Sequence, residues 1–387
     1  MKFIHAADLH LDTPFISISN FSQELQQKLK SSTYTAADKI FQTAISEQVD
    51  FVILAGDTFD NTERTLGAQM YLKNKFDELN KYGIKVFMVY GNHDYYRDGF
   101  SVIDFPNNVT IFSDEVSTSE LVTNDGQNVG ITGFSYYQNH VTEDMVQNYP
   151  DRKSYDYQIG ILHAGIGDGN YAPFSVSELL TKGYDYWALG HIHKREVLHE
   201  NPWIIYPGDT QGRNQNELEQ KGFYLVTVEN GITKPKFISS SIYVWKNAEI
   251  DVVENDTIND LNEKIKNLLN ESNSLVTLNI VNAQRLNKDI IKAIERNEIL
   301  MHFAGSNTAG VLYKIYLKFN NNRSLSMIDE KYWKDSEPNV FDLDNIKDMD
   351  SKLFSEEIIR EHINDPGFLN HIKELTKNSI NKKYIGD

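Results

Sequence analysis

Five short segments in the first half of the sequence carry side chains that can bind metal ions or move protons. They read ADLHLD, GDTFD, GNHD, LHAG and GHIH. Their potential metal ligands are carboxylate, imidazole and amide groups, at Asp8, His10, Asp57, Asn92, His163, His191 and His193. The chain has no cysteine, which excludes thiolate sites and leaves ligands suited to hard or borderline cations. The residue types therefore predict a site for divalent metal ions.

These ligands can be divided between two ions if one carboxylate bridges them, and Asp57 is the natural bridge. One ion would take Asp8, His10, Asp57 and His193, and the other would take Asp57, Asn92, His163 and His191. Two cations on the order of 3.5–4 Å apart can hold a phosphate for in-line attack and spread the developing charge. The ligand set thus predicts a two-metal phosphoesterase.

Four further residues are candidates for catalysis or substrate contact. His93 follows a predicted ligand directly and is expected to stabilise the phosphorane-like transition state or to help protonate the leaving oxygen. Asp94 is placed to orient that imidazole. Arg213 in YPGDTQGRN and Arg97 after GNHD are candidates for contacting a substrate phosphate, although a structural turn and a solvated loop are alternatives.

Each segment alone also has a simpler explanation. A lone D-x-H is usually a turn, and a lone GD after a strand more often caps a helix. Asn beside His at a strand end can cap a helix, and His191 and His193 can be two faces of a continuing strand. All five segments in this order favour one shared site.

The elements that must position these residues are short apolar runs alternating with helical patterns. Strands are predicted at KFIHAADLH, FVILAGD, IKVFMVYGNHD, NVGITGF, YQIGILHAG and YDYWALGHIH, with helices at residues 36–48 and 66–80. In open α/β sheets, ligands gather at the carboxyl ends of the strands. We therefore expect a layered α/β fold that brings the five segments to one edge.

The pattern of apolar and polar residues changes after about residue 238, and three regions are predicted. Residues 1–240 form the predicted phosphoesterase domain, and residues 248–322 a small α+β unit with helices at 256–270 and 288–296 and strands at 274–281 and 310–319. A polar connector then leads to a helical C-terminal segment at 340–387, with helices at 354–365 and 366–380.

Bulk composition limits the other function classes. Hydrophobic residues at 40% and aromatic residues at 12% are typical of a globular protein, and no apolar run reaches the roughly 20 residues of a membrane helix. The first residues do not resemble a signal peptide, so a cytoplasmic location is expected. The net charge of −17 argues against a protein that coats duplex DNA alone. A nucleic-acid substrate would need metal cations, a local basic patch or a partner.

In this order the motifs resemble those of the calcineurin-like metallophosphoesterases. IHAADLHLDTPF, YPGDTQGRN and the added C-terminal unit look like the SbcD-type DNA repair exonucleases, particularly their YhaO-like branch, and the motif match covers about residues 1–215. The resemblance implies a four-layer α/β/β/α sandwich, two manganese ions at the ligands named above, and a nuclease that acts on DNA ends. It also implies an SbcC-like (YhaN-like) coiled-coil ATPase partner, a C-terminal capping domain, an ATPase-docking segment at 340–387 and, by analogy, a homodimer.

Asp60 departs from the family pattern, because SbcD-type nucleases commonly carry a second histidine at the end of the GD motif. This departure leaves exonuclease strength and polarity open. Two other functions also remain open. The same metal core hydrolyses small phosphoesters, although GDTFDNTERT lacks the GDxxDRG continuation of protein Ser/Thr phosphatases. A regulatory scaffold with a silent metal site is the other alternative.

Overall fold

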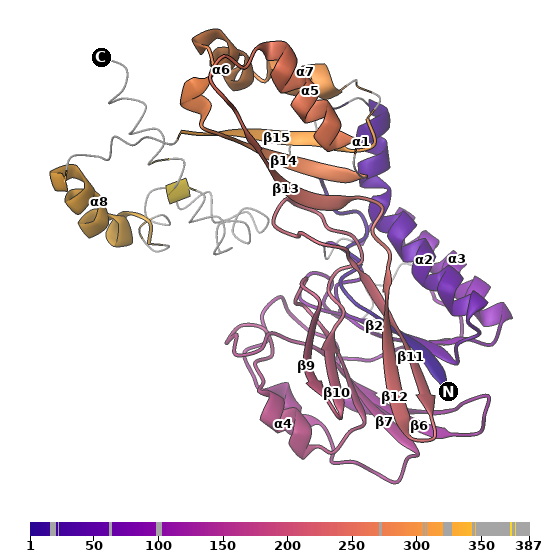
Figure 1. The fold of residues 1–387 in the computed structure, drawn as a ribbon. Coiled ribbons are helices and arrows are strands. Elements are labelled where there is room, and N and C mark those ends of the chain that lie inside the picture. Colours follow the sequence, from indigo (N-terminus) through magenta and orange to yellow (C-terminus); the bar gives the residue numbers. More distant parts are fainter. Residues whose placement is uncertain are drawn as a thin grey trace. The chain divides into compact units, whose positions relative to one another are not determined.

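The computed structural model of the 387-residue chain describes residues 1–15, 21, 23–61, 64–97, 103–270, 273–304, 306, 308–319, 327–342, 345, 372–373 and 376. The chain divides into two compact units: Met1–Lys246 with Asn273–Leu275, and Asn247–Ser272 with Val276–Asp387. Figure 1 shows the elements of both. The two helices predicted at 354–365 and 366–380 lie outside the described residues, apart from residues 372–373 and 376.

The described residues of the first unit form two six-stranded sheets. The first has the order β12-β11-β1-β2-β3-β4, from β1 (Lys2–Ala6), β2 (Phe51–Ala55), β3 (Lys85–Val89), β4 (Val109–Ile111), β11 (Gly222–Glu229) and β12 (Ile232–Ser239). The second has the order β5-β6-β7-β8-β10-β9, from β5 (Ser117–Val122), β6 (Asn128–Gly133), β7 (Tyr157–His163), β8 (Tyr186–Gly190), β9 (Glu196–Glu200) and β10 (Trp203–Tyr206). The four neighbours β1 to β4 are parallel, as are β6, β7, β8 and β10.

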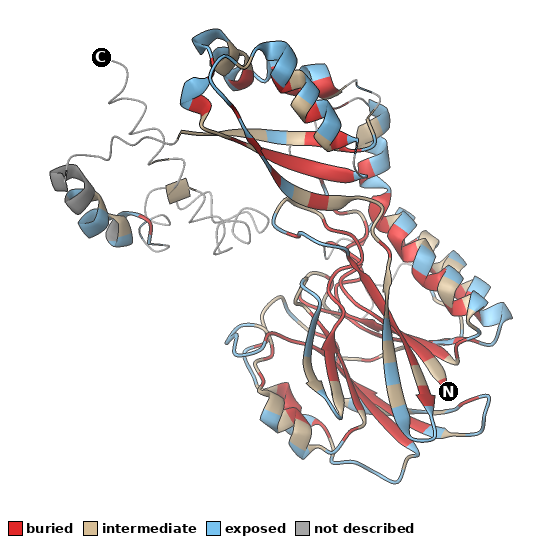
Figure 2. Cartoon of the chain, in the orientation of Figure 1, coloured by how far each residue is buried: buried red, intermediate tan, exposed pale blue. Residues whose placement is uncertain are grey.

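Apolar side chains on alternate faces of the strands build the layers of this unit. Phe3 and Phe51 face the second sheet, in a cluster with Ile159, whereas Ile4 and Val52 pack under the helices of the first sheet. The helices of this unit are α1 (Gln23–Lys30), α2 (Ser32–Ser46), α3 (Leu66–Lys81) and α4 (Val176–Thr181), with the 3₁₀ helix η1 (Met145–Asn148). Helices α2 and α3 cover the first sheet, and α4 and η1 cover the second. The predicted four-layer α/β/β/α sandwich is confirmed, and Figure 2 shows its buried strands.

The central parallel strands end together, which is what positions the ligand segments. Val52 lies beside Ile4 on one side and beside Val86 on the other, so the loops after β1, β2 and β3 leave the same edge of the first sheet. In the second sheet His163, the last residue of β7, lies beside Gly190, the last residue of β8. Every residue of β2, β7 and β8 is buried, as expected for parallel strands covered on both faces.

The second unit contains a sheet of order β13-β14-β15, from β13 (Val244–Asp251), β14 (Ser274–Val281) and β15 (Val311–Lys318). Its helices are α5 (Ile258–Leu269), α6 (Lys288–Glu295), α7 (Glu298–Ala304) and α8 (Met327–Val340), with the 3₁₀ helix η2 (Ala283–Arg285). Thr257 and Asp260 close a capping box that fixes the start of α5.

A polar connector was predicted where the structure has helix α8, so that prediction was wrong. A polar composition argues against a buried helix but not against an exposed one. The first observed helix that packs on the sandwich, α2, also begins at Ser32, earlier than the predicted residue 36. In the part of the chain that the structure describes, no helix is long and apolar enough to cross a membrane.

Candidate metal centre

Four of the predicted ligands lie on loops whose backbone is unusual. Asp8, His10 and Asp57 have φ angles of 51°, 44° and 46°, and His191 has a φ of 101°. Such angles are uncommon for residues with a Cβ and persist only where surrounding bonds impose them. Here the N–H of Asp8 donates to the carbonyl of Gly56 at 3.1 Å, and that of His10 donates to the carbonyl of Asp57 at 3.0 Å. The two loops therefore hold each other in this conformation.

Two glycines give the ligands room to converge. A Cβ added at Gly91 would lie 2.3 Å from Asp57 Oδ1 and 2.5 Å from His163 Nε2. A Cβ added at Gly190 would lie 1.9 Å from the carbonyl oxygen of Ala55, on the facing sheet. The glycines of GNHD and GHIH thus permit a close approach that other residues would block.

One group of ligand atoms comes from Asp8, His10 and His193, which lie within 4.8 Å of one another. The two rings bring their Nε2 atoms to 3.3 Å. Nδ1 of His10 lies 3.3 Å from Asp60 Oδ1, and Nδ1 of His193 lies 3.1 Å from a Glu217 oxygen. A carboxylate only accepts, whereas Nη2 of Arg213, which lies 3.1 Å from Nδ1 of His193, only donates, so both kinds of neighbour meet at this nitrogen. The two Nε2 atoms that face each other beside the carboxylate of Asp8 are an arrangement that a bound cation satisfies.

A second group of ligand atoms converges on the side-chain oxygen of Asn92. His163 Nε2 lies 3.1 Å from this oxygen, and His191 Nδ1 lies 3.2 Å from the same oxygen. His163 Nε2 is also 3.4 Å from Asp57 Oδ2. The other ring nitrogen of His163 is bonded to the backbone carbonyl of Ala55 at 3.0 Å, which leaves Nε2 for the site. These donors are also suited to a divalent cation.

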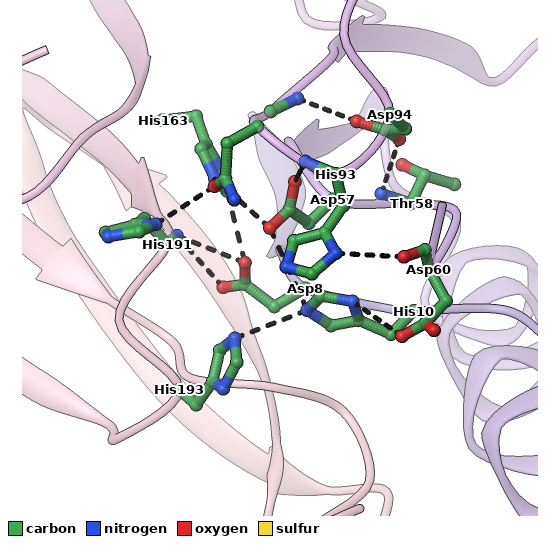
Figure 3. Close-up of polar contacts among 12 residues, drawn as sticks. Asp8, His10, Asp57, Thr58, Asp60, His93, Asp94, His163, His191 and His193 are labelled. Atoms are coloured by element: carbon green, nitrogen blue, oxygen red, sulfur yellow. Dashed lines mark hydrogen bonds and ion pairs between the residues drawn. The ribbon is translucent and has the colours of Figure 1, made fainter. Parts of the chain in front are cut away.

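Asp57 lies between the two groups. Its Oδ2 atom is 3.4 Å from His163 Nε2 on one side and 3.9 Å from His10 Nε2 on the other. Its Oδ1 atom accepts the backbone N–H of His93 at 3.0 Å, which fixes the carboxylate plane. Figure 3 shows the carboxylate in the middle of the converging side chains. The position is the one that a bridging ligand needs.

Burial and neighbouring charges shift the pKa values of these groups. Burial lowers the pKa of His10 to about 3, and the nearby Arg213 contributes in the same direction. Burial acts to raise the pKa of Asp57, yet His163 holds it well below the ordinary value. Burial also disfavours a charged His163, but Asp57 raises its pKa to about 9, so this ring must lose its proton to bind a cation. Asp57 is therefore an anion and His10 a neutral ring near pH 7, the forms that bind metals.

His93 lies beside the ligands, with its ring 4.9 Å from that of His10, centroid to centroid. Its Nδ1 atom is bonded to the backbone carbonyl of Asp60 at 2.9 Å. Asp94, which was predicted to orient this imidazole, does not contact it through its carboxylate. The carboxylate of Asp94 instead accepts the backbone N–H groups of Gly91, Thr58 and Phe59 at 2.7, 2.8 and 3.1 Å.

Asp94 is thus a buried anchor that joins the GNHD loop to the GDTF loop. The adjacent sequence positions of His93 and Asp94 suggested that their side chains interact. The carboxylate of Asp94 instead binds three backbone N–H groups, because the two loops meet only in the folded sandwich. Burial raises its pKa to about 6, and the nearby Asp57 adds to the shift. Arg64, which the sequence analysis missed, donates to the backbone carbonyls of Asp94 and Tyr95 from a buried position. Nothing in the local sequence around Arg64 indicated this.

The two candidate substrate contacts are placed differently. Arg213 lies within the site, where its Nη1 atom is 3.0 Å from Asp60 Oδ1. Arg97 is exposed and packs its guanidinium on the ring of Tyr95, 4.5 Å from the centroid. Glu217, whose carboxylate contacts both His193 and Arg213, is a site residue that was not predicted. It lies in a turn, where no helical or strand spacing could have pointed to it.

A model of the calcineurin-like phosphoesterase family matches residues 1–195. The chain is 41% identical over 260 residues to the uncharacterized metallophosphoesterase YhaO of Bacillus subtilis, a match that covers 66% of this chain and 64% of that protein. The chain therefore spans less than two thirds of the length of this relative.

More distant similarity extends to proteins named for DNA metabolism. The chain is 25% identical over 285 residues to the DNA double-strand break repair protein Mre11 of Methanocaldococcus jannaschii, covering 70% of this chain and 75% of that protein. It is 24% identical over 325 residues to a component of the nuclease SbcCD of Staphylococcus epidermidis, covering 76% of this chain and 82% of that protein. A solved dimetal phosphatase from Danio rerio matches with a TM-score of 0.39 and 11% identity, over 62% of this chain and 96% of that one.

Proposed function

The chain belongs to the calcineurin-like phosphoesterase family, and we propose that it is a manganese-dependent, two-metal nuclease that hydrolyses phosphodiester bonds in DNA. The observation that carries the proposal is the convergence of donors from both sheets on Asp57. His10 approaches it from the first sheet and His163 from the second. The ligand set of one ion is Asp8, His10, Asp57 and His193, and that of the other is Asp57, Asn92, His163 and His191.

Two divalent cations at these ligands would polarise a phosphodiester and lower the pKa of a water. The protein's own contribution to proton transfer is His93. Its Nδ1 atom faces a carbonyl, which can only accept a hydrogen bond, so Nδ1 carries a hydrogen and Nε2 is the atom that exchanges a proton. Because the backbone N–H of the same residue holds Asp57, His93 keeps a fixed position beside the bridging carboxylate. We assign to Nε2 the protonation of the leaving oxygen.

DNA as the substrate is supported by the names of the relatives. Mre11 is named as a DNA double-strand break repair protein, and the relative from Staphylococcus epidermidis as part of a nuclease. By the same relation we propose an SbcC-like ATPase as the partner, which would supply the cationic surface that a chain of net charge −17 lacks. Asp60, in place of the second histidine, leaves cleavage polarity to experiment, and homodimerisation and a cytoplasmic location remain predictions.

Substitution of the bridging carboxylate tests this function. The full chain and its Asp57→Ala variant would be incubated with Mn²⁺ and end-labelled duplex DNA, single-stranded DNA, bis(p-nitrophenyl) phosphate and p-nitrophenyl phosphate, with and without the ATPase. We expect DNA cleavage by the wild type and a loss of at least about 10³-fold in the variant, because neither ion keeps its shared ligand. Asp77→Ala, which removes an exposed carboxylate paired with Lys73, is the matched control.

The substrates separate the competing functions. Turnover of only the monoester or the small diester would identify a hydrolase of small phosphoesters. Mn²⁺ binding that raises the melting temperature without cleavage of any ester, even with the ATPase present, would identify a scaffold. Undiminished DNA cleavage by Asp57→Ala would refute the two-metal mechanism itself.

A further inference from the structure

Two carboxylates contact the outer ring nitrogens of the histidines assigned to the first ion. Asp60 Oδ1 lies 3.3 Å from Nδ1 of His10, and Glu217 Oε1 lies 3.1 Å from Nδ1 of His193. The inner nitrogens of the two rings meet at 3.3 Å. Metal-binding histidines commonly donate their other ring N–H to a carboxylate, which fixes the tautomer and the ring plane. Both histidines of this ion have a carboxylate beside the outer ring nitrogen, although the two carboxylates are far apart in the sequence.

Arg213 joins these two carboxylates. Its Nη1 atom lies 3.0 Å from Asp60 Oδ1. Its Nη2 atom lies 3.3 Å from Glu217 Oε1 and 3.1 Å from Nδ1 of His193, so the guanidinium also contacts that ring directly. Its backbone N–H also donates to the second oxygen of Glu217 at 2.5 Å. The guanidinium is mostly buried, with 13% of its side chain exposed, against 9% for each carboxylate. We refer to Asp60, Arg213 and Glu217 together as the Arg213 bracket.

Asp60 makes further hydrogen bonds besides the one with the guanidinium. The hydroxyl of Thr13 donates to the carboxylate of Asp60, and the backbone carbonyl of Asp60 accepts from the ring of His93. Asp60 therefore contacts His10 through its side chain and His93 through its backbone. A carboxylate with so many donors is suited to positioning and not to attack or proton abstraction, which gives the departure from the family pattern a structural role.

We propose that Arg213 is a positioning residue, which locks Asp60 and Glu217 against His10 and His193, and is not the phosphate-binding residue that its place at the site edge suggested. The proposal rests on the proposed metal-dependent function. The planar guanidinium directs one nitrogen to each carboxylate. Because the group is mostly buried, moving the guanidinium toward a phosphate would leave two buried carboxylates without their shared cation. Arg213 then acts on the reaction only through the ligands of one ion.

The two roles predict opposite results. Arg213→Ala, Arg213→Lys and Glu217→Gln would be compared with the wild type by Mn²⁺ titration calorimetry of the full chain. We expect one of two Mn²⁺ equivalents to bind about 10–100-fold more weakly in Arg213→Ala and Glu217→Gln, as is typical when the partner of a ligating histidine is lost. At saturating Mn²⁺, the KM for bis(p-nitrophenyl) phosphate should be unchanged. Unchanged Mn²⁺ affinity with a raised KM would overturn the proposal in favour of substrate binding.

Three comparisons keep the test decisive. Arg152→Ala removes a half-exposed arginine that pairs with Asp185, and it should leave Mn²⁺ affinity as in the wild type. Arg213→Lys keeps the charge but cannot reach both carboxylates, so it should recover only part of the Mn²⁺ affinity that Arg213→Ala loses. Full recovery of the Mn²⁺ affinity would show that charge alone matters and would refute the proposal. The electron paramagnetic resonance spectrum of Mn²⁺ reports paired against single ions without any catalysis. If the wild type binds Mn²⁺ but cleaves no phosphoester, the proposed function fails while the bracket is still decided by the titration.

Discussion

A single methyl group at Gly91 should disrupt metal binding while leaving the fold intact. The Cβ of Gly91→Ala would lie 2.3 Å from Asp57 Oδ1, 2.5 Å from His163 Nε2 and 2.7 Å from a carbon of the same ring. Real Cβ atoms essentially never approach other atoms closer than 3.0 Å, so the carboxylate of Asp57 must withdraw by at least about 0.7 Å. Metal–ligand distances tolerate only about 0.2 Å.

The size of the effect follows from these displacements. Overpacking of this kind costs about 1–3 kcal/mol of folding free energy, because both neighbours belong to the packed interior. The larger effect is on metal binding, because two proposed ligands of one ion move together. We expect the Mn²⁺ affinity of that site to fall by at least about 100-fold, or about 2.7 kcal/mol.

Chemical denaturation with and without Mn²⁺ measures both effects. The metal-free variant should unfold through the same transitions as the metal-free wild type, with slightly lower stability of the first unit, and the stabilisation that Mn²⁺ adds to the wild type should largely disappear. Gly67→Ala in α3 is the matched control, since its Cβ would meet only Thr65 Oγ1 at 3.8 Å and should stabilise the helix by about 0.5–1 kcal/mol. Full Mn²⁺ stabilisation of Gly91→Ala would refute the placement of Asp57 and His163 as ligands.

Three other predictions concern pH, metal removal and the second unit. Burial lowers the pKa of His5 to about 3 from its ordinary 6.5, so the unfolded chain binds the extra proton between these values and stability falls as the pH drops below 6.5. The stability difference between wild type and His5→Phe should shrink by about 1.3 kcal/mol from pH 7 to 5.5 in urea titrations, and a pH-independent difference would contradict a buried neutral ring. Free Mn²⁺ at about 100 times its Kd should stabilise the wild type by about 2.7 kcal/mol per site, an effect that a chelator reverses and that Asp57→Ala should not show in the same melting experiment. Thr257→Ala should cost about 1 kcal/mol through the lost cap of α5 and leave the Mn²⁺ titration unchanged, whereas weaker Mn²⁺ binding would show that this cap affects the metal centre.

The strand ends and the kinds of donor that follow them were predictable from the sequence. Strands such as FVILA and YWALG are recognisable because continuous apolar runs are local properties of a buried parallel strand, and the structure has them at Phe51–Ala55 and Tyr186–Gly190. Donors such as Asp57 and His191 follow these strands within a few residues. Since parallel strands end at a shared edge, a rule about strands was enough to predict that the five segments converge.

The partner that each side chain contacts depends on the tertiary structure. Asp94 faces the loop after β2 and not the ring of its neighbour His93, and Arg213 reaches across 153 positions of sequence to Asp60. Such choices depend on which donors and acceptors the packed sheets bring within about 3 Å, and the sequence carries no local pattern for them. Residue types and strand order therefore specify which groups gather, whereas the packing of one sheet against the other specifies which group each of them contacts.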